Sequence, residues 1–261
     1  MLKSFYNVLK IVPKLIKHMG LKQSLLYVLF NLKLKKLNQN KIIKTKSGIN
    51  IPLIDKKIFL YYNEYNEHNI VKYIKTTKEY GTFINIGAAY GEFLFFSAIN
   101  PLFEYIYGFE PVPIYFKIIK RVLKINPNFA RKINVRNIAL GNYTGSAKFY
   151  LNQDTPTDSS LSPLSSSKEI EVNIHKLDDL KLKIKNTPLL LIDVEGHEIE
   201  VLKGAKDFIH KYKPTIIIEV WEKDVSQYKK SISEIDYKCN YIWKGKKSNT
   251  QYWKLIPVKK L

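Results

Sequence analysis

The chain has 261 residues and a formal net charge of +20, with 43 Lys and Arg against 23 Asp and Glu. This length suits one large α/β domain with a well-buried core and an N-terminal extension, and it argues against a second full domain. The single cysteine, Cys239, excludes an internal disulfide and a cysteine-ligated metal cluster, which favours a reducing compartment.

The positive charge would attract phosphate-rich partners, such as nucleic acid, an anionic membrane surface or a nucleotide-linked glycan. Abundant Lys, Ile and Asn with little Arg is also the composition that an AT-rich genome encodes, so both explanations of the charge stay open. The chain has no arginine-rich patch with interleaved aromatic residues, and nucleic acid is therefore the less favoured partner.

Residues 1–60 are predicted to form a basic amphipathic extension followed by a hairpin, and residues 61–261 the main domain. Apolar residues from Phe5 to Ile16 fall on one helical face with lysines around it. The apolar run 25–32 is shorter than the roughly twenty residues needed to span a bilayer. We expect a cytoplasmic protein, and the extension either packs on protein or lies on the inner face of an anionic membrane. Alternation around Ser47-Gly48 predicts the hairpin over 41–53.

The most informative stretch is 82–96, where an apolar strand leads through a glycine turn into a helix. Gly87 and Gly91 lack a Cβ, so the chain can bend sharply there and a ligand can lie against the backbone. About twenty residues later, the strand 105–109 ends in Glu110, the position from which a carboxylate can bind ribose hydroxyls. The pattern predicts a nucleotide-type cofactor site, although a glycine pair alone also fits an ordinary tight turn.

The rest of the chain alternates predicted strands and helices. Helices are predicted over 114–123, 198–210 and 226–235; strands over 133–140, 146–151, 169–174, 187–192 and 214–219; and a terminal hairpin over 237–243 and 251–258. The polar segment 152–168 is predicted to be a binding loop, a lid or disordered, and Ser159 and Ser160 within it could contact an acceptor. Asp193, Glu195 and His197 follow a buried strand, so they should face the same crevice as Gly87 and Glu110.

Several spaced motifs together resemble a known family. They are Phe83-Ile84-Asn85-Ile86-Gly87-Ala88 with Gly91, Gly108-Phe109-Glu110-Pro111, Asn137-Ile138-Ala139-Leu140-Gly141 with Gly145, Asp158-Ser159-Ser160-Leu161, Leu177-Asp178-Asp179-Leu180, and Ile192-Asp193-Val194-Glu195-Gly196-His197-Glu198 continuing into Val201-Leu202-Lys203-Gly204-Ala205. In this order the motifs resemble the FkbM-type methyltransferases, over about residues 65 to 222. The resemblance implies a Rossmann-like, doubly wound, mostly parallel seven-stranded sheet of the class I methyltransferases.

The resemblance also implies a cofactor and a reaction. The cofactor would be S-adenosylmethionine, and its methyl group would go to an oxygen of a sugar, glycan or related natural-product or lipid-linked acceptor. The implied cofactor-binding residues are Asn85, Gly87, Ala88, Gly91, Glu110, Ala139, Leu140, Asn142 and Asp193. Three positions depart from the usual family pattern: Asn85 replaces an acid, Ala89 an asparagine and Leu191 a lysine.

A hydroxyl acceptor must lose its proton, and a base with a pKa near neutrality suits that task. His197 is the first candidate for this base, with Asp193 or Glu195 as base or as the group that orients the histidine. Equally, His197 could cap a helix or satisfy a buried group. Asp193, Glu195 and Glu219 offer the hard oxygens that Mg²⁺ prefers, but their spacing is not diagnostic, and no metal is assigned. A non-catalytic binding protein in glycan assembly and an RNA methyltransferase are the alternative functions.

Overall fold

A computed structural model describes residues 12–17, 20–21, 24–25, 27–29, 41–54, 56–64, 67–152, 161, 167–245 and 249–258. Most of the predicted N-terminal amphipathic segment therefore lies outside the described residues, and so do Ser159 and Ser160. Among the helices that are described, none is both long enough and apolar enough to cross a bilayer.

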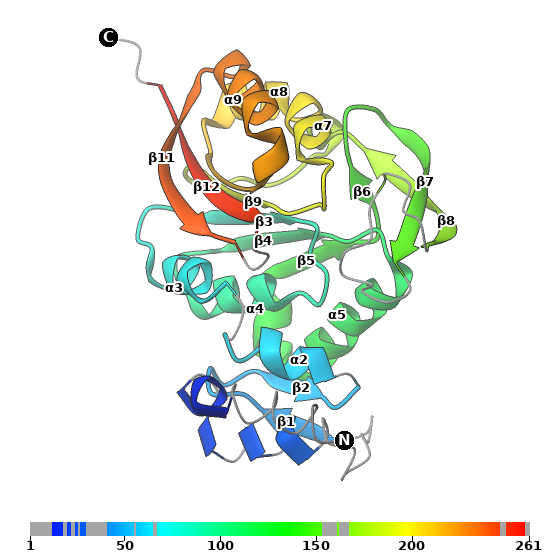
Figure 1. Cartoon of the computed structure of the whole chain (residues 1–261), viewed down its shortest axis with the longest axis vertical. Coiled ribbons are helices and arrows are strands. Elements are labelled where there is room, and N and C mark those ends of the chain that lie inside the picture. Colours follow the sequence, from blue (N-terminus) through cyan, green and yellow to red (C-terminus); the bar gives the residue numbers. More distant parts are fainter. Residues whose placement is uncertain are drawn as a thin grey trace.

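The centre of the molecule is a seven-stranded sheet with the strand order β11-β12-β10-β9-β3-β4-β5 (Figure 1). Its strands are β3 (Thr82–Ile86), β4 (Tyr105–Phe109), β5 (Ile133–Arg136), β9 (Pro188–Ile192), β10 (Thr215–Trp221), β11 (Tyr237–Lys244) and β12 (Thr250–Pro257). The five strands from β10 to β5 pair in parallel, and the terminal hairpin adds β12 and β11 in antiparallel pairing. The predicted fold class is confirmed.

Helices cover both faces of this sheet (Figure 1). The helices from residue 56 onward are α2 (Lys56–Tyr61), which lies beside β2 (Asn50–Pro52), α3 (His68–Thr76), α4 (Glu92–Ile99), α5 (Pro113–Ile125), α6 (Pro127–Ala130), α7 (Glu198–Lys203), α8 (Lys206–Tyr212) and α9 (Val225–Glu234). Alternate residues of β3 enter two separate cores: Phe83 packs with α3, α4 and α5, whereas Ile84 packs with α7, α8 and α9. Strands buried on both faces explain the continuous apolar runs in the sequence.

The predicted single strand 133–140 is wrong, because the chain leaves the main sheet after Arg136. The Nδ2 atom of Asn137 donates hydrogen bonds to the carbonyl oxygens of Glu110 and Pro111, at 2.8 and 2.9 Å, which turns the backbone away. The next residues form β6 (Ala139–Leu140), which joins a separate sheet with β7 (Gly145–Asn152) and β8 (Ser167–His175), in the order β6-β8-β7.

The predicted helix 198–210 is also wrong as one unit, because it breaks into α7 and α8 at Gly204. A Cβ at Gly204 would lie 1.8 Å from the carbonyl oxygen of Gly141, so the two backbones are in direct contact there. The carboxylate of Asp178 accepts hydrogen bonds from the backbone N–H groups of Asp207 and Phe208, which starts the second helix. Side-chain capping of this kind satisfies amide donors that a helix start leaves open.

The predicted N-terminal hairpin is present as β1 (Ile42–Lys44) and β2 (Asn50–Pro52), paired in antiparallel fashion. Ile49 and Ile51 are fully buried in the same core as Phe83. The side-chain amide of Asn126, at the end of α5, accepts from the backbone N–H of Asn50 and donates to its carbonyl oxygen. The hairpin is thus attached to the main core, and the division of the chain at residue 60 stays a prediction.

Candidate active site

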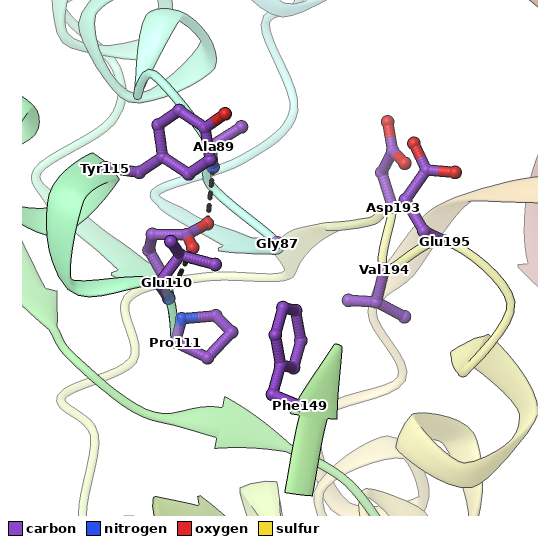
Figure 2. A pocket seen from close by; sticks show the side chains of 10 residues that line it. Gly87, Ala89, Glu110, Pro111, Tyr115, Phe149, Asp193, Val194 and Glu195 are labelled. Atoms are coloured by element: carbon purple, nitrogen blue, oxygen red, sulfur yellow. Dashed lines mark hydrogen bonds between the residues drawn. The ribbon is translucent and has the colours of Figure 1, made fainter. Parts of the chain in front are cut away.

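The carboxyl ends of β3, β4 and β9 enclose a pocket (Figure 2). It is lined by Gly87, Ala89, Glu110, Pro111, Val112, Tyr115, Phe149, Asp193, Val194 and Glu195. Its volume is about 60 Å³, whereas pockets for drug-sized ligands typically have about 300–1,000 Å³. The enclosed part of the pocket is therefore narrow, and Phe149 on β7 and Tyr115 on α5 are the two aromatic side chains that line it.

The turn that follows β3 depends on glycine at two positions. Gly87 has a φ of 82°, and a Cβ there would lie 1.9 Å from the carbonyl oxygen of Asp193. Gly91 has a φ of 85°, and a Cβ there would lie 2.8 Å from Cγ1 of Ile119. Side chains at either position would meet both a left-handed backbone and a close neighbour. Buried Ala88 lies between them, and its N–H and that of Gly87 donate to the carbonyl of Phe109 at the end of β4.

Ala89 also has a left-handed backbone, with a φ of 44°. Alanine adopts this conformation at a cost of about 1–2 kcal/mol, whereas asparagine, the residue that the family resemblance implies here, tolerates it better. The conformation directs the N–H of Ala89 toward the carboxylate of Glu110, at 2.7 Å from Oε2. The departure from the family pattern is thus a strained residue in direct contact with the acid of the pocket.

Two backbone hydrogen bonds hold the carboxyl group of Glu110 in the pocket lining. Its Oε1 accepts a second hydrogen bond, from the backbone N–H of Val112 at 2.8 Å, and the residue is only 4% exposed. Burial raises the pKa of Glu110 to about 8, and the hydrogen bonds from Val112 and Ala89 oppose that rise. A carboxyl group has about four positions for hydrogen bonds, one of them an O–H donor when it is protonated, so two stay available for the hydroxyls of a ligand.

Asp193 stands on the other side of the pocket, directly after β9. Its backbone N–H donates to the carbonyl of Ile86, which continues the pairing of β9 with β3. Its Oδ2 accepts a hydrogen bond of 2.5 Å from the hydroxyl of Tyr252 on β12. Tyr252 is fully buried, and burial, with the charge of Asp193, raises its pKa well above the usual value, so it remains a donor. This bond fixes one oxygen of Asp193 and leaves the other for a ligand.

The turn after Asp193 is built around the buried carboxylate of Glu198. Its Oε1 accepts from the backbone N–H groups of Val194 and Gly196, both at 3.1 Å, and its Oε2 accepts from the hydroxyl of Tyr228 at 2.6 Å. Burial raises the pKa of Glu198, and the hydrogen bond from Tyr228 is the largest opposing effect. Glu195 has a left-handed φ of 55° within this turn, so Glu198 positions the side chain of Glu195 beside the pocket.

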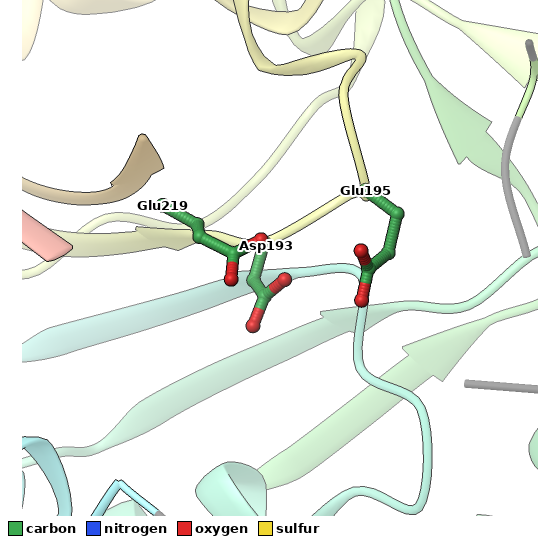
Figure 3. Close-up of side chains that lie close together, drawn as sticks. All are labelled: Asp193, Glu195 and Glu219. Atoms are coloured by element: carbon green, nitrogen blue, oxygen red, sulfur yellow. The ribbon is translucent and has the colours of Figure 1, made fainter. Parts of the chain in front are cut away.

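The three acids considered for a metal lie together (Figure 3). One carboxylate oxygen each from Asp193, Glu195 and Glu219 lies within 4.8 Å of the others. Their side chains come from the loop after β9 and from β10. Hard oxygen ligands suit Mg²⁺, and a cluster of negative charge equally suits the cationic part of an organic ligand.

Several predicted site residues lie outside the pocket lining. Asn85 is fully buried on β3, and neither its Nδ2 nor its Oδ1 has a hydrogen-bond partner among the residues that the structure describes. Ala139 and Leu140 are buried in β6, and Asn142 is exposed in the turn that follows. Gly91 lies at the end of the glycine turn, where a Cβ would meet Ile119. The roles of these residues in cofactor binding stay predictions.

His197 also lies apart from the residues that line the pocket. Its Nε2 is buried beside Gly141, 3.2 Å from the place where a Cβ of that glycine would lie. Burial lowers the pKa of His197, and Nε2 has no hydrogen-bond partner among the described side chains and backbone. Burial thus disfavours the charged imidazole, and the role of His197 as general base stays a prediction.

Sequence reasoning missed three residues that shape the site. Glu198 stands inside the motif that carries Asp193, and its position directly before an apolar helical run was the available signal. Tyr252 and Phe149 come from strands far along the chain, and no local pattern marks them. Their contacts with the site depend on how β12 and β7 are placed.

The chain was compared with known families. The family model described as the methyltransferase FkbM domain matches residues 85–242, which is more than half of the chain. The chain belongs to the FkbM methyltransferase family. The matched region is therefore a methyltransferase domain by family. A search of curated proteins found no match.

The fold is also that of a solved structure, an FkbM methyltransferase. The FkbM methyltransferase from Methylobacillus flagellatus is 18% identical, with a TM-score of 0.51, over 95% of this chain and 60% of that one. The chain thus spans about 60% of the length of that protein. A ribosomal protein L11 methylase from Lactobacillus delbrueckii is 6% identical, with a TM-score of 0.47, over 85% and 84%. A precorrin-6y C5,15-methyltransferase from Geobacter metallireducens is 11% identical, with a TM-score of 0.43, over 73% and 87%.

Proposed function

We propose that this FkbM methyltransferase is an O-methyltransferase that acts on a hydroxyl of a sugar, a glycan or a related natural-product or lipid-linked acceptor. The observation that carries the proposal is Asp193, which lines the pocket with one oxygen fixed by Tyr252. A fixed carboxylate beside the cofactor turn is suited to take the proton of an acceptor hydroxyl.

The residues of the pocket fit S-adenosylmethionine chemically. Gly87 lines the pocket with its backbone alone, and Glu110 keeps positions for hydrogen bonds with the ribose hydroxyls. The acids near Asp193 suit the ammonium and sulfonium charges. When bound, the cofactor supplies a methyl group activated for in-line displacement.

Each residue then has a proposed role in the reaction. Glu110 binds the ribose and sets the depth of the cofactor. Asp193 accepts the proton of the acceptor hydroxyl, while Tyr252 keeps its carboxylate oriented. Glu195 contributes negative charge beside it. Holding the acceptor oxygen about 3 Å from the methyl carbon and in line with it supplies much of the rate.

Calorimetry with S-adenosylmethionine tests the cofactor site first. We expect heat of binding with the wild type and none with Glu110→Ala, which removes the ribose acceptors. Absence of heat with both S-adenosylmethionine and S-adenosylhomocysteine in the wild type would contradict the proposed function. Mass spectrometry of the host's glycans and lipids, with and without the gene, then identifies the acceptor as the species that lacks one CH₂ unit per missing methyl group.

Once the acceptor is identified, Asp193→Asn tests whether Asp193 is the general base. The exchange keeps the shape of the side chain but removes its charge, so we expect weaker cofactor binding and, at saturating cofactor, a loss of roughly 10²–10⁴ in kcat, the usual range for a general base. Unchanged turnover would assign the proton transfer elsewhere, and His197→Gln in parallel shows whether the imidazole carries it. Cofactor binding without turnover on any hydroxyl acceptor would favour the non-catalytic binding protein.

The same assay with a chelator of divalent cations addresses the three clustered acids. We expect transfer to continue, because proton removal and charge complementarity account for Asp193 and Glu195 in the proposed reaction. Activity that disappears with the chelator and returns with Mg²⁺ would instead make these acids metal ligands.

A further inference from the structure

A second hollow lies between helix α3 and the terminal hairpin β11–β12, away from the cofactor pocket. It has a volume of about 430 Å³, which is within the range of small-molecule sites. The residues that the argument uses are Asn69, Lys72 and Tyr73 on α3, Tyr241 and Trp243 on β11, and Lys254 on β12. We call this hollow the hairpin groove.

Aromatic rings form one wall of the hairpin groove. The ring centres of Tyr241 and Trp243 are 4.9 Å apart, and those of Trp243 and Tyr73 are 5.6 Å apart. Tyr241 is 56% exposed on the edge strand of the sheet. An aromatic face carries partial negative charge, so the C–H groups of a sugar ring can pack against it while the hydroxyls of the sugar stay outside.

The polar residues of the hairpin groove are basic or neutral. Lys72 is exposed, and the Nζ atom of Lys254 lies 4.7 Å from the centre of the Tyr73 ring. The side chain of Asn69 offers an amide donor and an acceptor for hydroxyls. Among the described residues that line the hairpin groove, none carries a carboxylate. Two ammonium groups without an acid favour a ligand that carries a negative charge.

The sheet connects the hairpin groove to the reaction centre. Tyr252, which holds Asp193, pairs directly with Trp243 of the neighbouring strand, and both pack against the core beneath α3 and α4. Three strand spacings separate β9 from β11, which is about 14 Å at about 4.8 Å per spacing. A few sugar units span that distance, so one acceptor chain could reach both places.

We propose that the hairpin groove is an acceptor subsite that binds an acidic sugar unit of an oligosaccharide, next to the unit that is methylated at Asp193. This inference rests on the proposed function and names the charge and the position of the acceptor. A single nucleic-acid strand fits the hairpin groove less well, because it requires a row of cations along several phosphates, whereas only two lysines line this site.

Binding is tested on the full chain by NMR, following the indole N–H signals and the dissociation constant. The probes are a tetrasaccharide of alternating glucuronate and N-acetylglucosamine, an uncharged N-acetylglucosamine tetramer and an eight-nucleotide uridine RNA. We expect the acidic tetrasaccharide to shift the Trp243 indole signal and to bind more tightly than the uncharged one. Tyr241→Ala and Lys72→Glu should each weaken its binding about tenfold, the equivalent of about 1.4 kcal/mol.

The chain provides a matched control for each variant. Ile242 is 50% exposed on the same edge strand, but it lines a different hollow on the opposite face of the sheet, together with Trp253. Lys238 lines that second hollow too. Ile242→Ala and Lys238→Glu should therefore leave binding of the acidic tetrasaccharide unchanged. Equal losses in the control variants, or no shift of the Trp243 signal, would overturn the proposal. So would RNA binding that is tighter and steeply dependent on salt.

Calorimetry with S-adenosylmethionine on the same samples separates this proposal from the proposed function. Cofactor binding and turnover without any effect of Tyr241→Ala would reject the hairpin groove alone. Sugar binding to a protein that gives no heat with the cofactor would reject the methyltransferase mechanism and leave the hairpin groove as a glycan site.

Discussion

Replacing Gly87 by alanine should damage both the stability of the fold and the cofactor site. The added Cβ would lie 1.9 Å from the carbonyl oxygen of Asp193, and the backbone φ of 82° is left-handed. The left-handed backbone costs about 1–2 kcal/mol, and relief of the overlap adds about 1–3 kcal/mol. The expected loss in the free energy of unfolding is therefore about 2–5 kcal/mol.

Gly196 provides the matched control for Gly87. It too has a left-handed backbone, with a φ of 98°, but a Cβ there would have no neighbour within 4 Å. Gly196→Ala should lose only the conformational part, about 1–2 kcal/mol. Urea denaturation measures both variants, and calorimetry with S-adenosylmethionine measures the site. If Gly87→Ala lost no more stability than Gly196→Ala and bound the cofactor normally, close contact of β3 and β9 at the pocket would be refuted.

Three further substitutions test the pocket. Ala89→Gly should raise the free energy of unfolding by about 0.5–1 kcal/mol in urea denaturation, because relief of the left-handed backbone exceeds the entropic cost of glycine; a loss of stability would contradict the strain. Since the pKa of Glu110 is raised to about 8, from about 4.3 when unfolded, its protonated form stabilises the fold at low pH. This contribution to stability is lost as pH rises through 8. Glu110→Gln should therefore remove this part of the pH dependence of the free energy of unfolding between pH 5 and 9. An unchanged pH dependence in the variant would contradict the raised pKa of Glu110. Tyr228→Phe leaves Glu198 without its hydroxyl donor and should lower the free energy of unfolding by about 1–3 kcal/mol and also lower the activity. The control Tyr237→Phe removes a distant hydrogen bond to a carbonyl and should lower the stability alone. Equal effects of the two variants on turnover would show that the turn is not held by Glu198.

The parts of the fold that were predicted correctly are encoded by neighbouring residues. The strand before Gly87 was recognisable because burial on both faces requires a continuous apolar run. The position of Glu110 followed from the spacing of two adjacent parallel strands. These features are runs and spacings along the chain, which can be read without knowing which side chains meet.

The incorrect predictions have long-range causes. The strand 133–140 was expected to continue, but hydrogen bonds from Asn137 to the loop after β4 turn the chain away. The helix 198–210 was expected to be unbroken, but contact between Gly204 and the backbone of Gly141 interrupts it. In both cases a segment far along the chain overrides a local preference that is worth less than about 1 kcal/mol per residue.

The sequence by itself determined the family and indicated the glycine turn, because the motifs and the two glycines can be read along the chain. Only the tertiary structure decided which side chains meet at the turn. Tyr252 holds Asp193 from 59 residues away, Phe149 lines the pocket from a separate sheet, and His197 turns toward Gly141. The direction of a side chain depends on what packs against it, and these neighbours come together only when the distant strands are in place.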